Sequence, residues 1–237
     1  MRLWGAWTLE LTILKTSPYL PFSLLLGFLF AAVPWSFSWA QSSAHGWVTK
    51  AADWQKLKAG KTIFLNTPEE ALKSKPTETA AILVDSPPHE VWAVIADKEG
   101  APKFIKGLKS AKVLKRGPGY ELVEQKMTVG LIKVTYVLKD VSEPPDTVKF
   151  SRHSGDMKEI DGFWKFYPVD GGTQTLVVYR LGLKPGMGIP DLFVHSSLKT
   201  SLPEALRDVK GEVARRRAHD PESSKKPSVL KPLKSHK

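Results

Sequence analysis

Hydrophobic and polar residues alternate through a long central part of the chain, and this pattern predicts a series of β-strands. Residues 133–141 show it most clearly, because Val134, Tyr136 and Leu138 alternate with lysine and threonine. A strand with this period buries one face and leaves the other in water. The six strand-like segments are residues 108–115, 120–129, 133–141, 147–152, 159–168 and 173–183. Glycine or proline occupies the short breaks, so neighbouring segments are expected to pair as antiparallel strands.

The pattern differs before the first of these strands. Residues 79–85 form a hydrophobic run that predicts one more strand. Ser86 and the two prolines after it suit the start of a helix over residues 89–96. Residues 102–105 predict a further helical turn. Two short helices are therefore expected between the first strand and the six that follow.

A helical period replaces the alternation after Pro185. Hydrophobic residues recur every three or four positions as far as Val213, which predicts a long amphipathic helix. Pro203 lies inside this pattern, so we expect a kink there or a second helix that Ser201 caps. An antiparallel sheet with one dry face needs a cover, and this helix is the long amphipathic element that can supply it. The expected fold class is α+β, with a cavity or a packed core between sheet and helix.

The first forty residues predict a secretory signal peptide. Residues 20–39 carry no charged side chain, and the run from Leu24 to Val33 is shorter than the roughly 20 residues of a membrane span. Small residues at Ser38 and Ala40 predict cleavage after Ala40, with an uncleaved anchor as the alternative. We therefore expect an exported protein of the periplasm or envelope.

Three further regions follow the signal segment. Residues 41–78 are expected to form a lead-in helix and a short strand that pack on the main domain. Residues 79–217 form the main domain. Residues 218–237 are rich in lysine, serine and proline, and are expected to be a disordered basic tail.

The order of elements and several local sequences resemble the helix-grip fold of the START/Bet v 1-like (SRPBCC) superfamily. In that fold a curved antiparallel sheet wraps around a long C-terminal helix. Residues 82–92 (ILVDSPPHEVW) and 95–105 (IADKEGAPKFI) resemble its strand-to-helix entry, and residues 155–164 (GDMKEIDGFW) resemble its late hairpin. The coenzyme-Q-binding, Coq10-type or polyketide cyclase/dehydrase branch is the most similar. Residues 98–100 depart from the family, which commonly has an aromatic residue there. The resemblance implies an apolar ligand, although this fold serves transfer, sensing and ring cyclisation alike.

The net charge of +11, from 35 Lys and Arg against 24 Asp and Glu, first suggests an anionic partner. Much of it lies at the C-terminal end, where residues 207–237 hold ten Lys and Arg against four Asp and Glu. A nucleic-acid partner is not expected of an exported protein. An anionic membrane surface is the partner that this end could contact, and the alternative is that it only aids solubility. The basic residues concerned are Arg215, Arg216, Arg217, Lys225 and Lys226.

The residue types limit the chemistry. The absence of cysteine excludes disulfides, cysteine-ligated metals and a thiol nucleophile. The six histidines form no metal-binding spacing, and the sequence has no nucleophile elbow, P-loop or dinucleotide fingerprint. Neither a metal, nor a cofactor, nor a catalytic residue is therefore expected.

Side chains expected on the inner face of the sheet and on the helices are the candidates for a ligand pocket. Most are large and apolar, as in pockets that bind apolar small molecules. The candidates are Phe104, Met127, Tyr136, Phe150, Arg152, Trp164, Phe166, Tyr179, Leu192 and Phe193. Packing in a closed core is the alternative for each of them. Arg152 either anchors a polar group of the ligand or reaches solvent at the end of its strand.

Three functions remain open from the sequence. The first is an exported START-like module that binds or carries a lipid, a quinone or a polyketide-like molecule without catalysis. The second is a cyclase/dehydrase-type enzyme that uses the same pocket, for which Tyr136, Tyr179 and Arg152 are the acid–base candidates. The third is an interaction protein held at an anionic envelope surface by its basic tail.

Overall fold

In the computed structural model, the described residues are 44, 46–66, 75–186 and 191–219. All of them belong to one unit that spans residues 37–237. The predicted signal segment and the end of the basic tail lie outside the described residues. The elements are α2 (Ala51–Lys58), β1 (Ile63–Phe64), β2 (Thr77–Val84), α4 (Pro88–Ala96), η1 (Ala101–Lys103), β3 (Leu108–Gly117), β4 (Tyr120–Val129), β5 (Ile132–Glu143), β6 (Thr147–Gly155), β7 (Glu159–Val169), η2 (Asp170–Gly172), β8 (Gln174–Lys184) and α5 (Asp191–His219).

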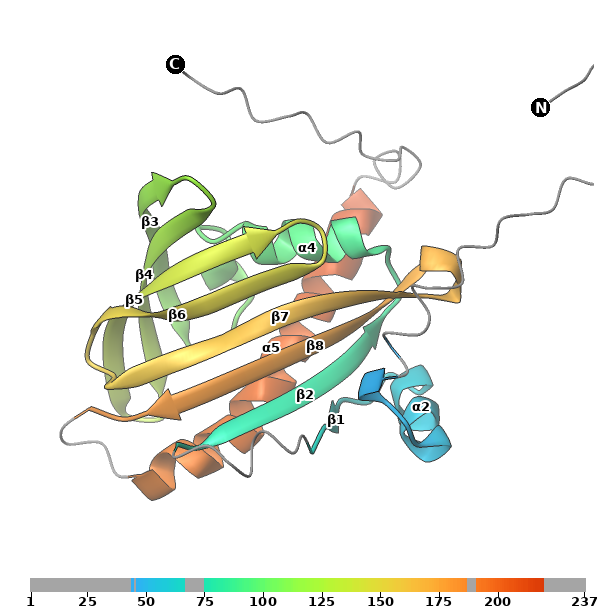
Figure 1. Ribbon diagram of the computed structural model, residues 1–237, viewed down its shortest axis with the longest axis horizontal. Coiled ribbons are helices and arrows are strands. Elements are labelled where there is room, and N and C mark those ends of the chain that lie inside the picture. The colour runs from blue at the N-terminus through green and yellow to red at the C-terminus, as the bar shows by residue number, and fades with distance from the viewer. Residues whose placement is uncertain (1–43, 45, 67–74, 187–190, 220–237) are drawn as a thin grey trace, which may run out of the picture. The chain divides into compact units, whose positions relative to one another are not determined.

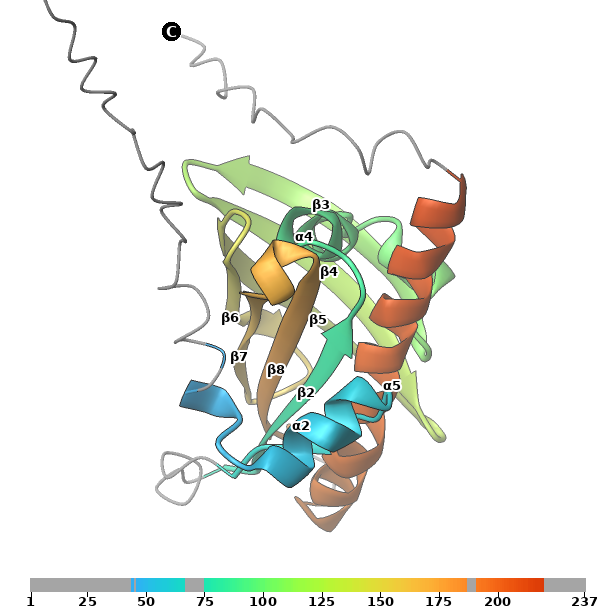
Figure 2. The same ribbon diagram turned by 90° about the vertical axis from the view of Figure 1, so that its right-hand side faces the viewer.

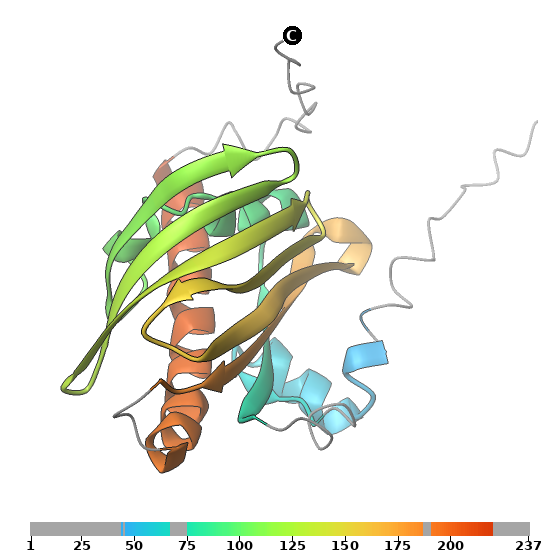
Figure 3. The same cartoon turned by 60° about the vertical axis from the view of Figure 1, so that its left-hand side comes forward.

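The described residues form one antiparallel sheet of eight strands, in the order β1-β2-β8-β7-β6-β5-β4-β3. The strands from β3 to β8 follow one another along the chain, as the short glycine- and proline-containing breaks predict. Figure 1 shows the sheet with α5 behind it, and Figure 3 shows the strands curving around that helix. The α+β helix-grip expectation is therefore confirmed, including the short helices α4 and η1 after β2.

The long helix α5 packs against the inner face of the sheet. Leu198, Leu202, Leu206 and Val209 are fully buried along one of its sides, in a core shared with β2, β8 and α4. Pro203 lies inside this one continuous helix. Apolar residues on both sides of the proline pack into the same core, and this burial outweighs the lost backbone hydrogen bond.

The expectation that Ser201 caps a second helix is wrong. The Ser201 hydroxyl donates instead to the carbonyl oxygen of Ser197, at 2.7 Å, one turn earlier in the same helix. Helix α4 also begins differently from the expectation, because its N-cap is Pro87 and has no side-chain cap. Ser86 is buried and its hydroxyl donates to Glu90 at 2.9 Å.

Helix α2 and the described residues before it pack on the other face of the sheet, next to the edge strand β1. Leu57, Ile63 and Leu65 lie in a second core with residues of β2, β7 and β8. The alternating residues of β2 divide between the two cores, so both faces of this strand are covered. Figure 2 shows α2 beside β2, and the Trp47 indole donates to the Tyr167 hydroxyl at 2.6 Å.

The last turns of α5 hold a network of ion pairs. Glu212 is buried and accepts hydrogen bonds from Arg215 and Arg216 at 2.7 and 2.8 Å. Arg216 also pairs with Asp97, at 2.7 Å, and Arg217 lies 3.3 Å from the carboxylate of Glu90. The three arginines expected to face an anionic surface therefore have partners within the fold, while Lys225 and Lys226 lie outside the described residues.

This network predicts an acid-dependent loss of stability. Hydrogen bonds from Arg215, and then from Arg216, lower the pKa of Glu212 from 4.5 to about 2. A lowered pKa stabilises the fold above the ordinary value, and this contribution is lost as the pH falls from 4.5 towards 2. Glu212→Gln should reduce the free energy of unfolding by about 1–3 kcal/mol at pH 7. Urea unfolding from pH 7 to pH 2 should show this difference shrinking with acid.

Glu143→Gln is the matched control, because Glu143 forms an exposed ion pair with Lys149. Its effect should be about 1 kcal/mol or less at neutral pH. A Glu212→Gln difference that stayed constant down to pH 2 would contradict the role given to the ionised carboxylate.

Candidate functional site

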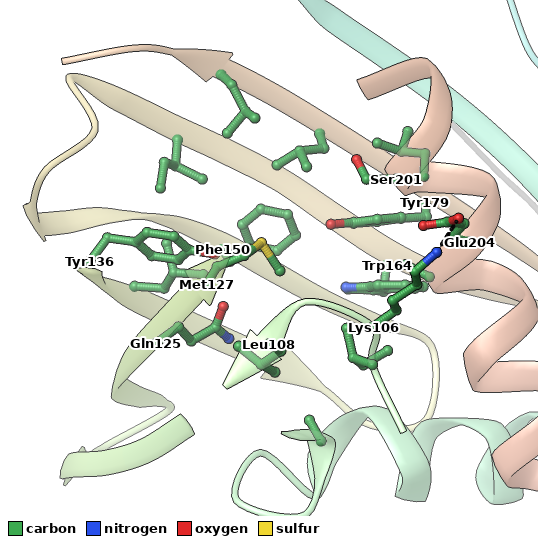
Figure 4. A pocket seen from close by; sticks show the side chains of 18 of the residues that line it. Lys106, Leu108, Gln125, Met127, Tyr136, Phe150, Trp164, Tyr179, Ser201 and Glu204 are labelled. Carbon is green, nitrogen blue, oxygen red and sulfur yellow. Dashed lines mark hydrogen bonds and ion pairs between the residues drawn. The ribbon is translucent and has the colours of Figure 1, made fainter. Parts of the chain in front are cut away.

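A cavity of about 220 Å³ lies between the inner face of the sheet and α5. Figure 4 shows it from close by, with the strands on one side and the helices on the other. Its walls come from β3–β8, α4, η1 and α5, and most of the lining side chains are apolar. The site is therefore formed jointly by strands β3–β8 and by the helices packed against them.

Phe150, Trp164 and Tyr179, on the neighbouring strands β6, β7 and β8, form an aromatic wall of the cavity. Trp164 of β7 and Tyr179 of β8 are register partners, and their rings stack with centroids 3.7 Å apart and 7° between planes. Phe150 of β6 lies 6.3 Å from Tyr179 at 50°. Gly162 faces Phe150 in the ladder, and a side chain there would collide with the ring. Glycine at this position therefore leaves room for the wall.

Two tyrosine hydroxyls supply polar groups to this apolar space. Tyr136 and Tyr179 line the cavity. In Figure 4 the phenol oxygen of Tyr179 and the indole nitrogen of Trp164 point towards the middle of the cavity. Burial raises the pKa of both phenols, and the negative charge of Asp140 raises it further. Both therefore stay protonated at neutral pH and act as hydrogen-bond donors rather than as bases.

A buried ion pair also lines the cavity. Lys98, in the turn after α4, lies 2.8 Å from the Oδ2 atom of Asp140, and the two side chains are 9% and 5% exposed. The Oδ1 atom of Asp140 has no hydrogen-bond partner among the described residues. Neither residue is among the candidates predicted from the sequence, although residues 98–100 depart from the family pattern. The available signal was the alternation of β5, where Asp140 continues the inward register of Tyr136 and Leu138.

The structure brings most of the ten candidate residues together. Phe166 is instead fully buried in the core beneath α5, and the side chains of Leu192 and Phe193 lie outside the described residues. The candidates that line the cavity are Phe104, Met127, Tyr136, Phe150, Trp164 and Tyr179.

Arg152 lies outside the cavity. Its side chain is exposed, and its guanidinium donates to the carbonyl oxygen of Gly155 at 3.0 Å. The pairing of β6 with β7 ends at Ser151 and Asp161, so the last residues of β6 pair with β5 alone. The placement corresponds to the solvent-reaching alternative, and it removes Arg152 from the acid–base candidates.

An ion pair between the loop after η1 and helix α5 lies in the lining of the cavity. Lys106 and Glu204 both line it and form an ion pair at 2.9 Å (Figure 4). The backbone N–H of Lys106 also donates to Asp208 at 2.9 Å. The loop after η1 is thus joined to α5 at two points.

No group of three or more histidine, aspartate or glutamate side chains among the described residues could hold a metal ion. No helix within the described ranges is long and apolar enough to cross a membrane.

The sheet, its C-terminal helix and the cavity between them define a protein of the START/Bet v 1-like superfamily. A family model described as polyketide cyclase / dehydrase and lipid transport matches residues 84–210, more than half of the chain. The chain belongs to this family. No curated protein sequence matches it.

Solved structures with low sequence identity share the fold. The Zhui aromatase/cyclase from Streptomyces sp. R1128 is 17% identical with a TM-score of 0.54, over 59% of this chain and 94% of that one. A STAR-related lipid transfer protein from Xanthomonas axonopodis is 13% identical with a TM-score of 0.53, over 65% and 92%. A START superfamily protein from Mycobacterium smegmatis is 14% identical with a TM-score of 0.52, over 59% and 98%.

Proposed function

We propose that the protein binds or carries an apolar small molecule, such as a lipid, a quinone or a polyketide-like ring, without changing it chemically. The observation that carries this proposal is the largely apolar cavity with its aromatic wall of Phe150, Trp164 and Tyr179. Its volume of about 220 Å³ is slightly below the roughly 300–1,000 Å³ of typical ligand pockets. The cavity therefore suits a compact ligand or one part of a longer ligand.

The state of the tyrosines supports binding over acid–base catalysis. A general base must be deprotonated near the working pH. Burial and the charge of Asp140 raise the pKa of Tyr136 and Tyr179 above the ordinary value of 10. Both phenols can orient a polar group of a ligand, but neither serves as a base at neutral pH.

Filling the cavity should weaken ligand binding. Ala205 of α5 lines the cavity, so Ala205→Trp should lower the affinity for 2-naphthol at least about tenfold because the indole occupies the space. Titration calorimetry measures this affinity. Native mass spectrometry after gentle purification should also show a co-purified small molecule in the wild type and less of it in the variant.

Ala214→Trp is the matched control, because Ala214 is an exposed alanine of the same helix. It should bind like the wild type. Equal binding by both tryptophan variants, or no binding by the wild type, would overturn the proposal.

A cyclase/dehydrase-type enzyme is the second candidate. The specific observation in its favour is the Lys98–Asp140 pair, since an acid and a base within one pocket are what such chemistry needs. The two candidates predict different fates for the co-purified molecule. A carrier releases it unchanged, whereas the enzyme alters its mass or its absorption spectrum during incubation.

We further propose that the protein acts after export. The support is the uncharged segment 20–39 and the small residues before the predicted cleavage site. We include two finer points in this proposal. The ligand is of the coenzyme-Q type, and the basic tail binds an anionic surface of the envelope.

A further inference from the structure

Burial of the Lys98–Asp140 ion pair is energetically unfavourable. The proposal of an apolar ligand does not explain why this pair lies in the cavity. Taking an ammonium and a carboxylate out of water carries a large desolvation cost. Both side chains are at least nine-tenths buried, and both line the cavity. Their position at the ligand space suggests that the pair takes part in recognition.

One oxygen of the carboxylate lacks a hydrogen-bond donor from the described residues. Lys98 Nζ lies 2.8 Å from Oδ2 and satisfies that atom. Oδ1 is buried and has no hydrogen-bond partner among the described residues. A buried acceptor without a donor is unfavourable, so a donor brought by a ligand would gain the full value of a charge-assisted hydrogen bond.

The strand pairing places Asp140 next to a residue of the aromatic wall. Asp140 and Phe150 are register partners in the β5–β6 ladder. The charge of Asp140 also raises the pKa of Tyr136 and Tyr179, as expected of a carboxylate near both phenols. An aromatic or aliphatic body against the wall would therefore bring its polar end near Asp140.

We propose that Asp140 Oδ1 accepts a hydrogen bond from a hydroxyl or N–H group of the ligand, while Lys98 holds the carboxylate in place. The inference rests on the proposed function and names its ligand class as an apolar molecule with a donating head, such as a phenol or an alcohol. A ligand whose head only accepts, such as an ether, an ester or a carboxylate, would place its lone pairs against those of Oδ1. The cavity therefore selects donors over acceptors.

A pair of probes that differ in one donor tests this selection. 2-Naphthol and 2-methoxynaphthalene share the same ring system, but the methoxy compound has no O–H. Wild-type protein should bind 2-naphthol about 10- to 100-fold more tightly, as expected for a hydrogen bond to a charged group. The readout is the ratio of the two dissociation constants by calorimetry.

A double variant tests the residues. Lys98→Met/Asp140→Leu removes both charges together, so neither charge remains buried alone. The preference for 2-naphthol should fall to less than about threefold. Glu143→Gln/Lys149→Met is the matched control, because this exposed pair also includes a carboxylate of β5 and lies outside the cavity. It should keep the wild-type ratio.

The outcomes separate the two proposals. Equal binding of both probes by the wild type overturns this inference and leaves the cavity as an apolar binding site. A preference that survives in the folded double variant assigns the recognition to another group and also overturns it. Failure of both probes to bind the wild type overturns the proposed function, and this inference with it. The wild-type ratio alone decides the ligand class if the double variant does not fold.

Discussion

Asp140→Leu alone should destabilise the protein by about 3–5 kcal/mol, because it leaves the ammonium of Lys98 buried without its partner. The two side chains are 9% and 5% exposed, so little water reaches the remaining charge. Lys98→Met should destabilise the protein for the same reason, because it leaves the carboxylate of Asp140 buried without its partner. The free energy of unfolding in urea measures both effects.

The double variant Lys98→Met/Asp140→Leu should recover most of this loss. Replacing a whole buried ion pair with apolar residues is often neutral or stabilising, because neither charge is then left alone. The exposed Glu143–Lys149 pair provides the comparison, since removing one of its partners should cost about 1 kcal/mol or less. A double variant as unstable as the single ones would mean that packing rather than charge is responsible.

Leu206→Ala should destabilise the fold by about 2–5 kcal/mol. Leu206 is fully buried in the core that joins α5 to β2 and β8, and it lies outside the cavity lining. Truncation therefore leaves a new void in a packed region and removes apolar surface from the interface. Urea or thermal unfolding followed by circular dichroism measures the loss.

Leu131→Ala makes the same chemical change at a side chain that is 99% exposed. Its effect should stay within about 0.5 kcal/mol. A comparable loss in both variants would mean that Leu206 does not hold α5 against the sheet as the structure describes.

The sequence predicts the strands and the inner face of the sheet well because both depend on local period. Alternation in residues 133–141 placed Tyr136 and Leu138 towards the inside, and both line the cavity. Alternation also predicted that Arg152 lies on the inner face, and this was wrong. The alternation of β6 does not show where its pairing with β7 ends. The β6–β7 pairing ends at Ser151, and the residues after it reach solvent.

The polar part of the site depends on contacts between distant segments. Asp140 follows the inward register of β5. A buried carboxylate at this position is explained only by its ion pair with Lys98, which comes from the turn after α4. Ser201 illustrates the same limit, since its position before Pro203 suits a helix cap. Burial of Leu198, Leu202 and Leu206 in one core keeps α5 continuous instead.

The pairing of β2 with β8 determines when the N-terminal half of the chain can fold. Thr77 pairs with Gly182 and Val84 with Thr175, so the ladder joins segments roughly a hundred residues apart, which slows folding. During synthesis, a chain that has not reached β8 and α5 has β2 and α4 but lacks the residues of β8 and α5 that share one core with them. The site and the stability of the N-terminal half therefore arrive together, when the final third of the chain becomes available.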